Sequence, residues 1–168
     1  MGDDAGDETF ESTDAGASHT YPMEAGQIRK GGYIMIKGNP CKVSDVSTSK
    51  TGKHGHAKCH FVAIDIFTGK KMEDLVPAGH TTSVPFVKKE ELQCIDADDD
   101  DFVTLLTAEG DTRSDIKLPR ALPPPEVPGA AELSEKILGM LKEEKDFFCI
   151  VQIACGREQI MDVKAMTQ

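Results

Sequence analysis

The apolar residues of this chain gather in short segments, and only one segment has the spacing of a helix. In Glu132–Lys145, apolar side chains recur every three or four positions, at Leu133, Ile137, Met140 and Leu141. The other segments are short, partly alternating, and separated by Gly, Pro, Asn or Asp, which is the pattern of strands and turns. A chain patterned in this way must fold mostly into β-sheet.

The expected strands fall into two groups. The first group lies in residues 33–76 and predicts a small antiparallel barrel, with strands over Tyr33–Lys37, Cys41–Val46 (with a bulge near Asp45), Lys58–Ile66 and Lys70–Val76. The second group places the single helix before the last pair of strands, which fits a five-stranded oligonucleotide-binding barrel, the OB-fold. Its strands are expected over Glu91–Ile95, Phe102–Thr107, Ser114–Leu118, Phe147–Ala154 and Gln159–Ala165.

Acidic and basic residues are separated along the chain. The net charge is −10, yet residues 26–90 contain eleven Lys or Arg and five Asp or Glu, which gives +6. Residues 1–25 contain seven acidic residues and no Lys or Arg, and residues 91–168 contain eight basic and seventeen acidic residues, which gives −9. A basic module within an acidic chain indicates a local contact with a polyanion, although an uneven surface without a partner is the simpler alternative.

These changes in composition predict the domain organisation. Residues 1–24 are acidic and without periodicity, so we expect a disordered tail. Residues 25–88 form the basic barrel, and residues 89–168 form the OB-fold domain, which contains the proline-rich segment Leu122–Gly129. No apolar run approaches the roughly 20 residues of a membrane helix, and no signal pattern is present, so we expect a soluble intracellular protein without a membrane partner.

The five cysteines are odd in number, include no C-x-x-C pair, and mostly lie among apolar residues. We therefore expect reduced, buried thiols instead of a disulfide framework or a zinc site.

The least apolar part of the basic module is SKTGKHGHAK, residues 49–58. It joins two expected strands, so we expect it at the tip of a hairpin. A phosphate-binding P-loop is excluded, because His54 stands where Ser or Thr is required and a strand follows in place of a helix. A metal site is disfavoured, because the spacing of its candidate ligands matches no zinc motif and two of them should point to opposite faces of a strand. Those candidate ligands are His54, His56, Cys59 and His60.

The residues alone leave two chemistries open for this tip, beside a solvated turn without a function. Its three lysines offer charge for a polyanion, and its glycines let backbone amides approach phosphates. Alternatively, an enzyme modifies one lysine, since Gly52 and Gly55 bracket Lys53 and His54 and leave the side chain accessible.

The segment STSKTGKHGHAK (47–58), followed by DIFTGKK (65–71), resembles the signature of the eukaryotic translation initiation factor 5A family. The resemblance extends over residues 19–166 and is looser in the second domain. In that family, one lysine receives the aminobutyl group of spermidine and is then hydroxylated to hypusine. By motif position that lysine corresponds to Lys53, and Lys50 corresponds to a position that is acetylated in the family. The resemblance assigns contact with tRNA and the ribosome to the whole tip: Lys50, Thr51, Gly52, Lys53, His54, Gly55, His56, Ala57 and Lys58.

The same resemblance implies the fold and the function. The family has an N-terminal SH3-like barrel and a C-terminal OB-fold barrel. It binds the ribosome, reaches the acceptor end of peptidyl-tRNA, and aids peptide-bond formation at slow sequences such as proline runs, as well as termination. Its partners include deoxyhypusine synthase and deoxyhypusine hydroxylase, and messenger RNA is a further candidate. The implied location is the cytoplasm, with the nucleus as a second compartment, and no cofactor or metal is implied.

Two other classes of function suit the sequence less well. An unmodified RNA-binding module acting on messenger RNA suits an OB-fold, but the second domain is acidic and Phe102, Phe147 and Phe148 are expected in its core. An enzyme is disfavoured, because no nucleophile is paired with a base and no carboxylate cluster lies in an expected cleft.

Overall fold

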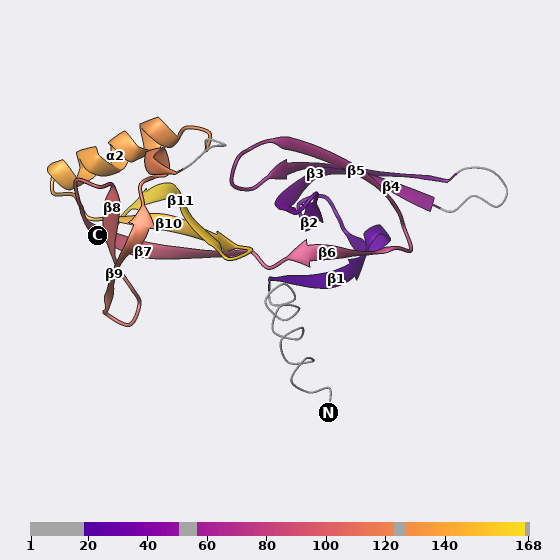
Figure 1. Cartoon of the computed structure of the whole chain (residues 1–168), viewed down its shortest axis with the longest axis horizontal. Helices are drawn as coiled ribbons and strands as arrows, with labels where there is room; N and C mark the ends of the chain where they lie inside the picture. Colours follow the sequence, from indigo (N-terminus) through magenta and orange to yellow (C-terminus); the bar gives the residue numbers. More distant parts are fainter. Residues whose placement is uncertain (1–18, 51–56, 123–126, 167–168) are drawn as a thin grey trace, which may run out of the picture. The chain divides into compact units, whose positions relative to one another are not determined.

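The computed structural model describes residues 19–50, 57–122 and 127–166. Residues 19–86 belong to one compact unit, and residues 87–153 and 157–166 to a second. The predicted mostly-β architecture with an OB-fold second domain is confirmed, and the described residues contain one α-helix (Figure 1). None of the helices in the described part of the chain is long and apolar enough to cross a membrane.

The first unit is built on a curled four-stranded antiparallel sheet in the order β2-β3-β4-β5. Its strands are β2 (Tyr33–Ile36), β3 (Asn39–Lys50), β4 (Ala57–Asp65) and β5 (Lys71–Pro77). The register of β3 against β4 shifts between Val43 and Asp45, so the bulge expected near Asp45 is confirmed. The hydroxyl of Ser44 donates a hydrogen bond to the Val62 carbonyl at 2.9 Å and ties the bulge to β4.

A two-stranded sheet completes this unit and shows that the predicted irregular tail, residues 1–24, is too long. Strand β1 (Thr20–Glu24) pairs with β6 (Thr81–Pro85), so Thr20–Glu24 is not part of an irregular tail. Tyr21 and Met23 alternate with Thr20, Pro22 and Glu24 and pack on the core. Pro22 obscured this pattern, yet a proline that lacks an N–H is compatible with an outer strand. The tail proper, residues 1–18, lies outside the described residues.

The core of the first unit collects the inward side chains of these strands. Its completely or almost completely buried members are Ala25, Ile28, Ile34, Ile36, Cys41, Val43, Cys59, Phe61, Ala63, Met72 and Val84. Ala25 belongs to a short 3-10 helix, η1 (Ala25–Gln27), that follows β1. This core fixes the middle of the β3–β4 hairpin by the buried side chains of Cys59 and Phe61.

The second unit is a five-stranded sheet in the order β11-β10-β7-β8-β9. Its strands are β7 (Lys88–Ala97), β8 (Phe102–Leu106), β9 (Thr112–Lys117), β10 (Phe147–Ala154) and β11 (Arg157–Ala165). Strand β11 also contacts β9, and an ion pair between Glu158 and Arg113 joins them, so the sheet curls toward a barrel. Its core is formed by Leu92, Cys94, Val103, Leu105, Ile116, Leu118, Ile137, Phe147, Cys149, Val151 and Ile160.

Helix α2 (Ala130–Lys142) packs on this barrel through Ser134 and Ile137. It follows a 3-10 helix, η2 (Pro119–Ala121). Compared with the predicted range Glu132–Lys145, it begins two residues earlier and ends three residues earlier. The reason is a Schellman-type end: Glu144 adopts a left-handed backbone with φ 56°, and the Lys145 N–H donates to the Met140 carbonyl at 2.9 Å.

Candidate functional site

The β3–β4 hairpin carries the predicted site. Its two strands remain in register to their ends, where Lys50 pairs with Ala57 and Ser49 with Lys58. The tip itself, residues 51–56, lies outside the described residues, and with it lie Lys53 and five other predicted site residues: Thr51, Gly52, His54, Gly55 and His56. The structure therefore describes the arms that present the tip, and it describes Lys50, Ala57 and Lys58 among the predicted residues.

The two strands of the hairpin become less buried toward the tip. Cys59 and Phe61 are buried in the core, whereas the last four residues of β3, Ser47–Lys50, are all exposed. The Ala78 N–H donates to the Ala57 carbonyl at 2.8 Å, which attaches the start of β4 to the segment after β5. The core therefore holds the middle of the hairpin, and the Ala57–Ala78 hydrogen bond holds β4 up to the end beside the tip, while the end of β3 extends into solvent.

Lysines lie on both faces of these arms. Successive side chains of a strand point to opposite faces, and directly paired residues share a face. Lys50 therefore shares the face of Ala57, while Lys58 shares the opposite face with Ser49. Both lysines are exposed. This arrangement gives the end of the hairpin a positive charge that is accessible from either side.

The strand after the tip separates the candidate metal ligands. Cys59 is buried, while His60 lies on the outer face, where its Nε2 is 3.0 Å from a carboxylate oxygen of Glu73. The expectation that Cys59 and His60 point to opposite faces is confirmed. Among the described residues, no three His, Cys, Asp or Glu side chains gather in a way that could hold a metal ion.

The second signature segment, DIFTGKK, has a structural role at the other end of β4. One carboxylate oxygen of the buried Asp65 accepts the N–H groups of Phe67 at 2.8 Å and of Thr68 at 3.1 Å. Gly69 closes the turn with φ 76°, a conformation that favours glycine. Because β4 rises about 3.3 Å per residue, this turn lies far from the tip and supports the hairpin without joining the site.

One exposed apolar residue on the same sheet was not predicted from the sequence. Leu75 of β5 pairs directly with His60, and its side chain is 57% exposed. A signal for this position existed in the sequence: alternation from the buried Met72 places Leu75 on the outward phase of the strand, where a polar residue is the rule.

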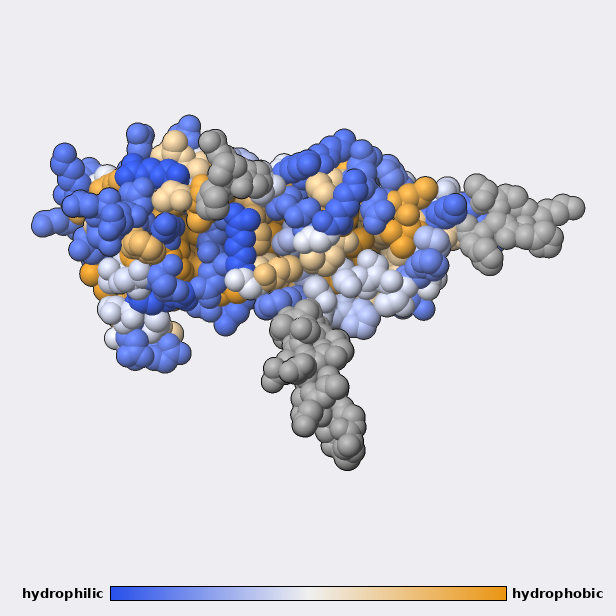
Figure 2. Space-filling model, viewed as in Figure 1, coloured by the Kyte–Doolittle hydropathy of each residue, from blue (hydrophilic) through white to orange (hydrophobic). Residues whose placement is uncertain are grey.

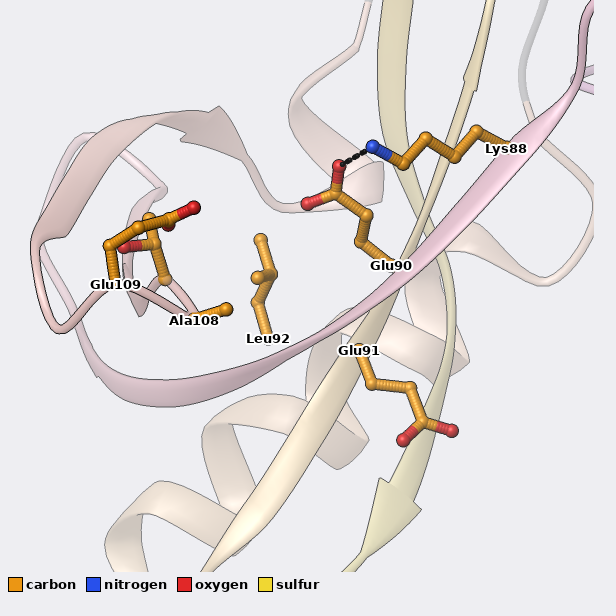
Figure 3. A pocket seen from close by; sticks show the side chains of 7 residues that line it. Lys88, Glu90, Glu91, Leu92, Ala108 and Glu109 are labelled. Carbon is orange, nitrogen blue, oxygen red and sulfur yellow. Dashed lines mark ion pairs between the residues drawn. The ribbon is translucent and has the colours of Figure 1, made fainter.

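The second unit contains a shallow cavity of about 470 Å³, lined by Lys88, Glu90, Glu91, Leu92, Thr107, Ala108 and Glu109. Figure 3 shows Glu90 turned toward Lys88 and Glu91 on the other side of β7. The amine of Lys88 is 3.0 Å from Glu90, and that of Lys164 is 3.1 Å from Glu91. A cavity with this excess of carboxylates repels phosphates, so it does not offer a nucleic-acid site.

The OB-fold face shows one feature that nucleic-acid binders use. Phe102 is only half-buried, and the Lys117 amine lies 5.0 Å from the centre of its ring. The expectation that three phenylalanines lie in the core is therefore correct for the fully buried Phe147, but not for Phe102 or Phe148, which are half-buried.

The cysteines match the sequence analysis. All five are free, and four of them are buried: Cys41, Cys59, Cys94 and Cys149. Burial, reinforced by the charge of Asp65 across the strand pair, raises the pKa of Cys41 to about 11. None is placed as a nucleophile beside the hairpin tip.

Family models match both halves of the chain. Residues 18–80 match the model described as "Translation initiation factor 5A-like, N-terminal". Residues 86–164 match the model described as "Eukaryotic elongation factor 5A hypusine, DNA-binding OB fold". The chain belongs to the translation initiation factor 5A family.

Individual members of this family agree over nearly the whole chain. The chain is 55% identical over 159 residues to eukaryotic translation initiation factor 5A-3 of Arabidopsis thaliana, covering 92% of each protein. It is 51% identical to eukaryotic translation initiation factor 5A of Zea mays, covering 96% of each. Among solved structures, a translation initiation factor 5A family protein from Naegleria fowleri is similar with a TM-score of 0.80 at 47% identity, covering 87% of this chain and 99% of that one.

Proposed function

We propose that this translation factor binds the ribosome and uses a hypusine at Lys53 to position the acceptor end of peptidyl-tRNA. In this proposal the factor promotes peptide-bond formation at slow sequences such as proline runs, and it also promotes termination. The observation that carries it is the β3–β4 hairpin, which is paired to its ends at Lys50 and Ala57 and extends beyond the core. The segment STSKTGKHGHAK, through its resemblance to the family signature, assigns the modified lysine to Lys53.

Physical chemistry agrees with this use of a hairpin. A lysine lengthened by an aminobutyl arm is a long, thin cation that fits an RNA-lined passage too narrow for a folded domain. Contacts of this cation with phosphate and ribose are largely independent of sequence, as a factor that accepts every tRNA requires. Lys50 and Lys58 add positive charge on either face of the arms. Holding the tRNA end in its reactive geometry lowers the entropic part of the barrier, while the ribosome performs the chemistry.

The proposal also covers the processing of the chain. Deoxyhypusine synthase and deoxyhypusine hydroxylase act on Lys53 in turn, and Lys50 is a candidate for acetylation. We propose that the factor acts in the cytoplasm, with the nucleus as a second location, and that it is not itself an enzyme.

The test is mass spectrometry of the peptide that contains Lys53, isolated from the native cell. A mass increase equal to one hydroxylated aminobutyl group at Lys53 is expected. Peptides that contain Lys50 or Lys58 without Lys53 serve as the internal control and should lack this increase. An unmodified Lys53 in native material would contradict the proposal.

A second candidate function is an unmodified RNA-binding module that acts on messenger RNA. The half-buried Phe102 with Lys117 over its ring favours this alternative, because stacking and cation–π contacts bind single strands. The net charge of −9 in residues 91–168 weakens it. If the alternative holds, RNA binding should depend on Lys117 and be independent of any modification at Lys53.

A further inference from the structure

Four exposed lysines gather at one end of the sheet of the first unit. Lys42 of β3 pairs with Ile64 of β4, and Ile64 pairs with Lys71 of β5. Directly paired residues share a face, and the exposure of both lysines identifies it as the outer face of the sheet. Lys70 immediately precedes β5, and Lys37 lies in the turn between β2 and β3. We call these four lysines, Lys37, Lys42, Lys70 and Lys71, the basic cluster.

The basic cluster lies at the end of the sheet that is distant from the tip. β3 runs from this end to Lys50, and β4 runs back from Ala57, so the turns that hold Lys37 and Lys70 are both at the far end. Lys42 is eight residues from Lys50, or roughly 25 Å along the strand. Figure 2 shows hydrophilic side chains over β3 and β5 on the visible face of the first unit. The cluster is therefore a basic surface separate from the lysines beside the tip.

The positive charge of the basic cluster is not neutralised within the described part of the chain. None of its four amines forms an ion pair there, and every ion pair of a described lysine or arginine belongs to the second unit. The next row of the outer face carries Asp45 and Glu73, and His60 lies 3.0 Å from Glu73. Asp74 lies on the opposite face, and Asp65 is buried. Four amines thus face two carboxylates, which leaves the surface positive.

The N-terminal tail joins the fold at this same end of the unit. In Figure 1, β1 begins on the side of the first unit away from the end of the hairpin. The turn after β10 belongs to this unit too and lies between the start of β1 and β2. There a Cβ added to Gly156 would lie 3.5 Å from the His19 Nε2, and the Cys155 Sγ is 3.7 Å from the Met35 Sδ. Met35 is two residues before Lys37, so the tail is attached close to the basic cluster.

The composition of the tail complements that of the cluster. Residues 1–18 contain no lysine or arginine and six carboxylates: Asp3, Asp4, Asp7, Glu8, Glu11 and Asp14. Asp14 is five residues before His19 and Asp3 is sixteen, so an extended chain carries these carboxylates up to roughly 17 and 55 Å from His19. All six are therefore within reach of the basic cluster.

We propose that the tail, residues 1–18, binds the basic cluster of its own chain and competes there with other polyanions. This inference does not depend on the modification of Lys53. An exposed ion pair contributes little by itself, but attachment to the fold gives the tail an effective concentration of roughly millimolar at the cluster. Because all the pairs are exposed, the contact should weaken as added salt screens them.

Position and attachment favour the tail over RNA as the occupant of the cluster. Under the proposed function, RNA meets the tip, which is at the other end of the sheet. The tail starts beside the cluster and is present in every molecule, so a free polyanion binds there only by displacing it. The tail therefore lowers the affinity of this surface for nucleic acids without covering the tip.

The first experiment is cross-linking of the full chain with a carbodiimide, which joins a carboxylate directly to an amine that touches it. Peptide mass spectrometry then locates the links. At low salt we expect the tail carboxylates to link to the basic cluster about fivefold more often than to Lys58, and the links to decline at roughly 0.5 M salt. Lys58 is the internal control, because it is an exposed lysine at the other end of the same sheet. Links that are absent, or equally frequent at Lys58, would overturn the proposal.

The second experiment measures competition, with a fluorescent oligouridylate as the probe. A neutral-tail variant of the full chain has its six carboxylates replaced by amides: Asp3→Asn, Asp4→Asn, Asp7→Asn, Glu8→Gln, Glu11→Gln and Asp14→Asn. At low salt we expect this variant to bind the probe about fivefold more tightly than the wild type, since the cluster is no longer occupied. The difference should shrink as salt is added, and an affinity equal to that of the wild type would contradict the competition.

A double-mutant cycle separates this contact from general repulsion by the tail. Lys42→Gln with Lys71→Gln should largely abolish the gain from the neutral tail, whereas Lys50→Gln with Lys58→Gln, the matched control at the other end of the sheet, should leave it intact. Thermal unfolding shows whether each variant retains the fold. An equal gain in both backgrounds would overturn the proposal. So would a probe that requires Lys42 and Lys71 in a chain without cross-links at the cluster, because the cluster would then be a nucleic-acid contact.

Discussion

Arg120 donates two hydrogen bonds to the carboxylate of Asp101, one from Nε at 3.1 Å and one from a terminal nitrogen at 2.8 Å. The pair joins η2 to the turn before β8. Asp101 also accepts the Leu118 N–H through its backbone carbonyl at 2.8 Å, and its backbone is left-handed with φ 68°. The hydrogen bonds from Arg120 lower the pKa of Asp101 below its ordinary value of 3.8.

This pair predicts a pH-dependent loss of stability in Asp101→Asn. Asparagine tolerates the left-handed backbone, so the substitution removes the charge with little added strain. Because the pKa of Asp101 is lower in the folded state, its ionisation stabilises the fold at neutral pH, and this contribution declines as the pH falls below 3.8 toward the lowered pKa. Urea unfolding at pH 7 should show the variant slightly less stable than the wild type, and the difference should shrink in acid. A difference that stays constant between pH 7 and the acid range would contradict this account.

Substitution of Ser134 in α2 should lower the stability of the fold more strongly. Its side chain is completely buried, and its hydroxyl accepts the Arg120 N–H at 3.0 Å. Ser134→Ala leaves that N–H without its partner, so we expect a loss of about 1–2 kcal/mol in the free energy of unfolding. The control is Ser114→Ala, which removes an exposed hydroxyl that lies 3.1 Å from that of Thr104. Its effect should stay within about 0.5 kcal/mol. Equal losses in the two variants would show that burial of Ser134 is not the cause.

The thiol of Cys41 should resist alkylation in the folded chain. Its side chain is buried, and its pKa of about 11 keeps it protonated at pH 8.5, where a thiol of ordinary pKa, 9.0, is partly ionised. We expect iodoacetamide to label Cys41 only after unfolding, while the partly exposed Cys155 reacts in the folded state. Rapid labelling of Cys41 in the folded chain would contradict the prediction.

The raised pKa of Cys41 also has a consequence for stability. The preference of the folded state for the neutral thiol stabilises the chain fully below pH 9.0, and this contribution is lost as the pH rises from 9.0 through about 11. In Cys41→Ala this contribution is absent. The free energy of unfolding of the variant should therefore fall less steeply over that range than that of the wild type.

The fold could be predicted from sequence wherever alternation or helical spacing was clear. The bulge near Asp45 followed from a break in the alternation of β3, and the helix followed from the spacing of Leu133, Ile137 and Leu141. The end of that helix could not be predicted, because it depends on the left-handed backbone of Glu144, and glutamate gives no signal for that conformation. The pair β1–β6 was missed for a related reason, since each of its short strands contains a proline and is defined by its partner.

Some features of the candidate site could likewise be predicted from the sequence, and others could not. The hairpin could be predicted, because two alternating strands flank a polar turn that contains Gly52 and Gly55. The assignment of Lys53 required the resemblance, since composition does not distinguish modification from polyanion binding. The exposure of Leu75 was missed, because it depends on which face of β5 points outward. Phe102 was misplaced, because the register that sets Lys117 beside it is a tertiary property.

Substitution of Lys58 should change the salt dependence of ribosome binding. It is exposed on one face of the hairpin arms, with no ion-pair partner among the described residues. If it contacts a phosphate, Lys58→Ala should weaken binding and reduce the slope of log affinity against log salt by about 1. Lys136→Ala, a substitution of an exposed lysine on helix α2, is the control and should leave the slope unchanged. Equal slopes for Lys58→Ala and the wild type would remove Lys58 from the interface.

Lys53→Arg tests the proposed function directly. Arginine keeps a positive charge but offers no primary amine to receive the aminobutyl group, so the long cation is never formed. In cells that depend on this variant, we expect ribosomes to pause at proline runs, measured as a reduced yield of a reporter that contains a run of prolines relative to one without it. Lys50→Arg is the matched control, because it makes the same change on the described end of β3, and it should support both reporters equally well. If Lys53→Arg also supports both reporters as the wild type does, then the charge of the tip is sufficient, and the role assigned to hypusine is wrong.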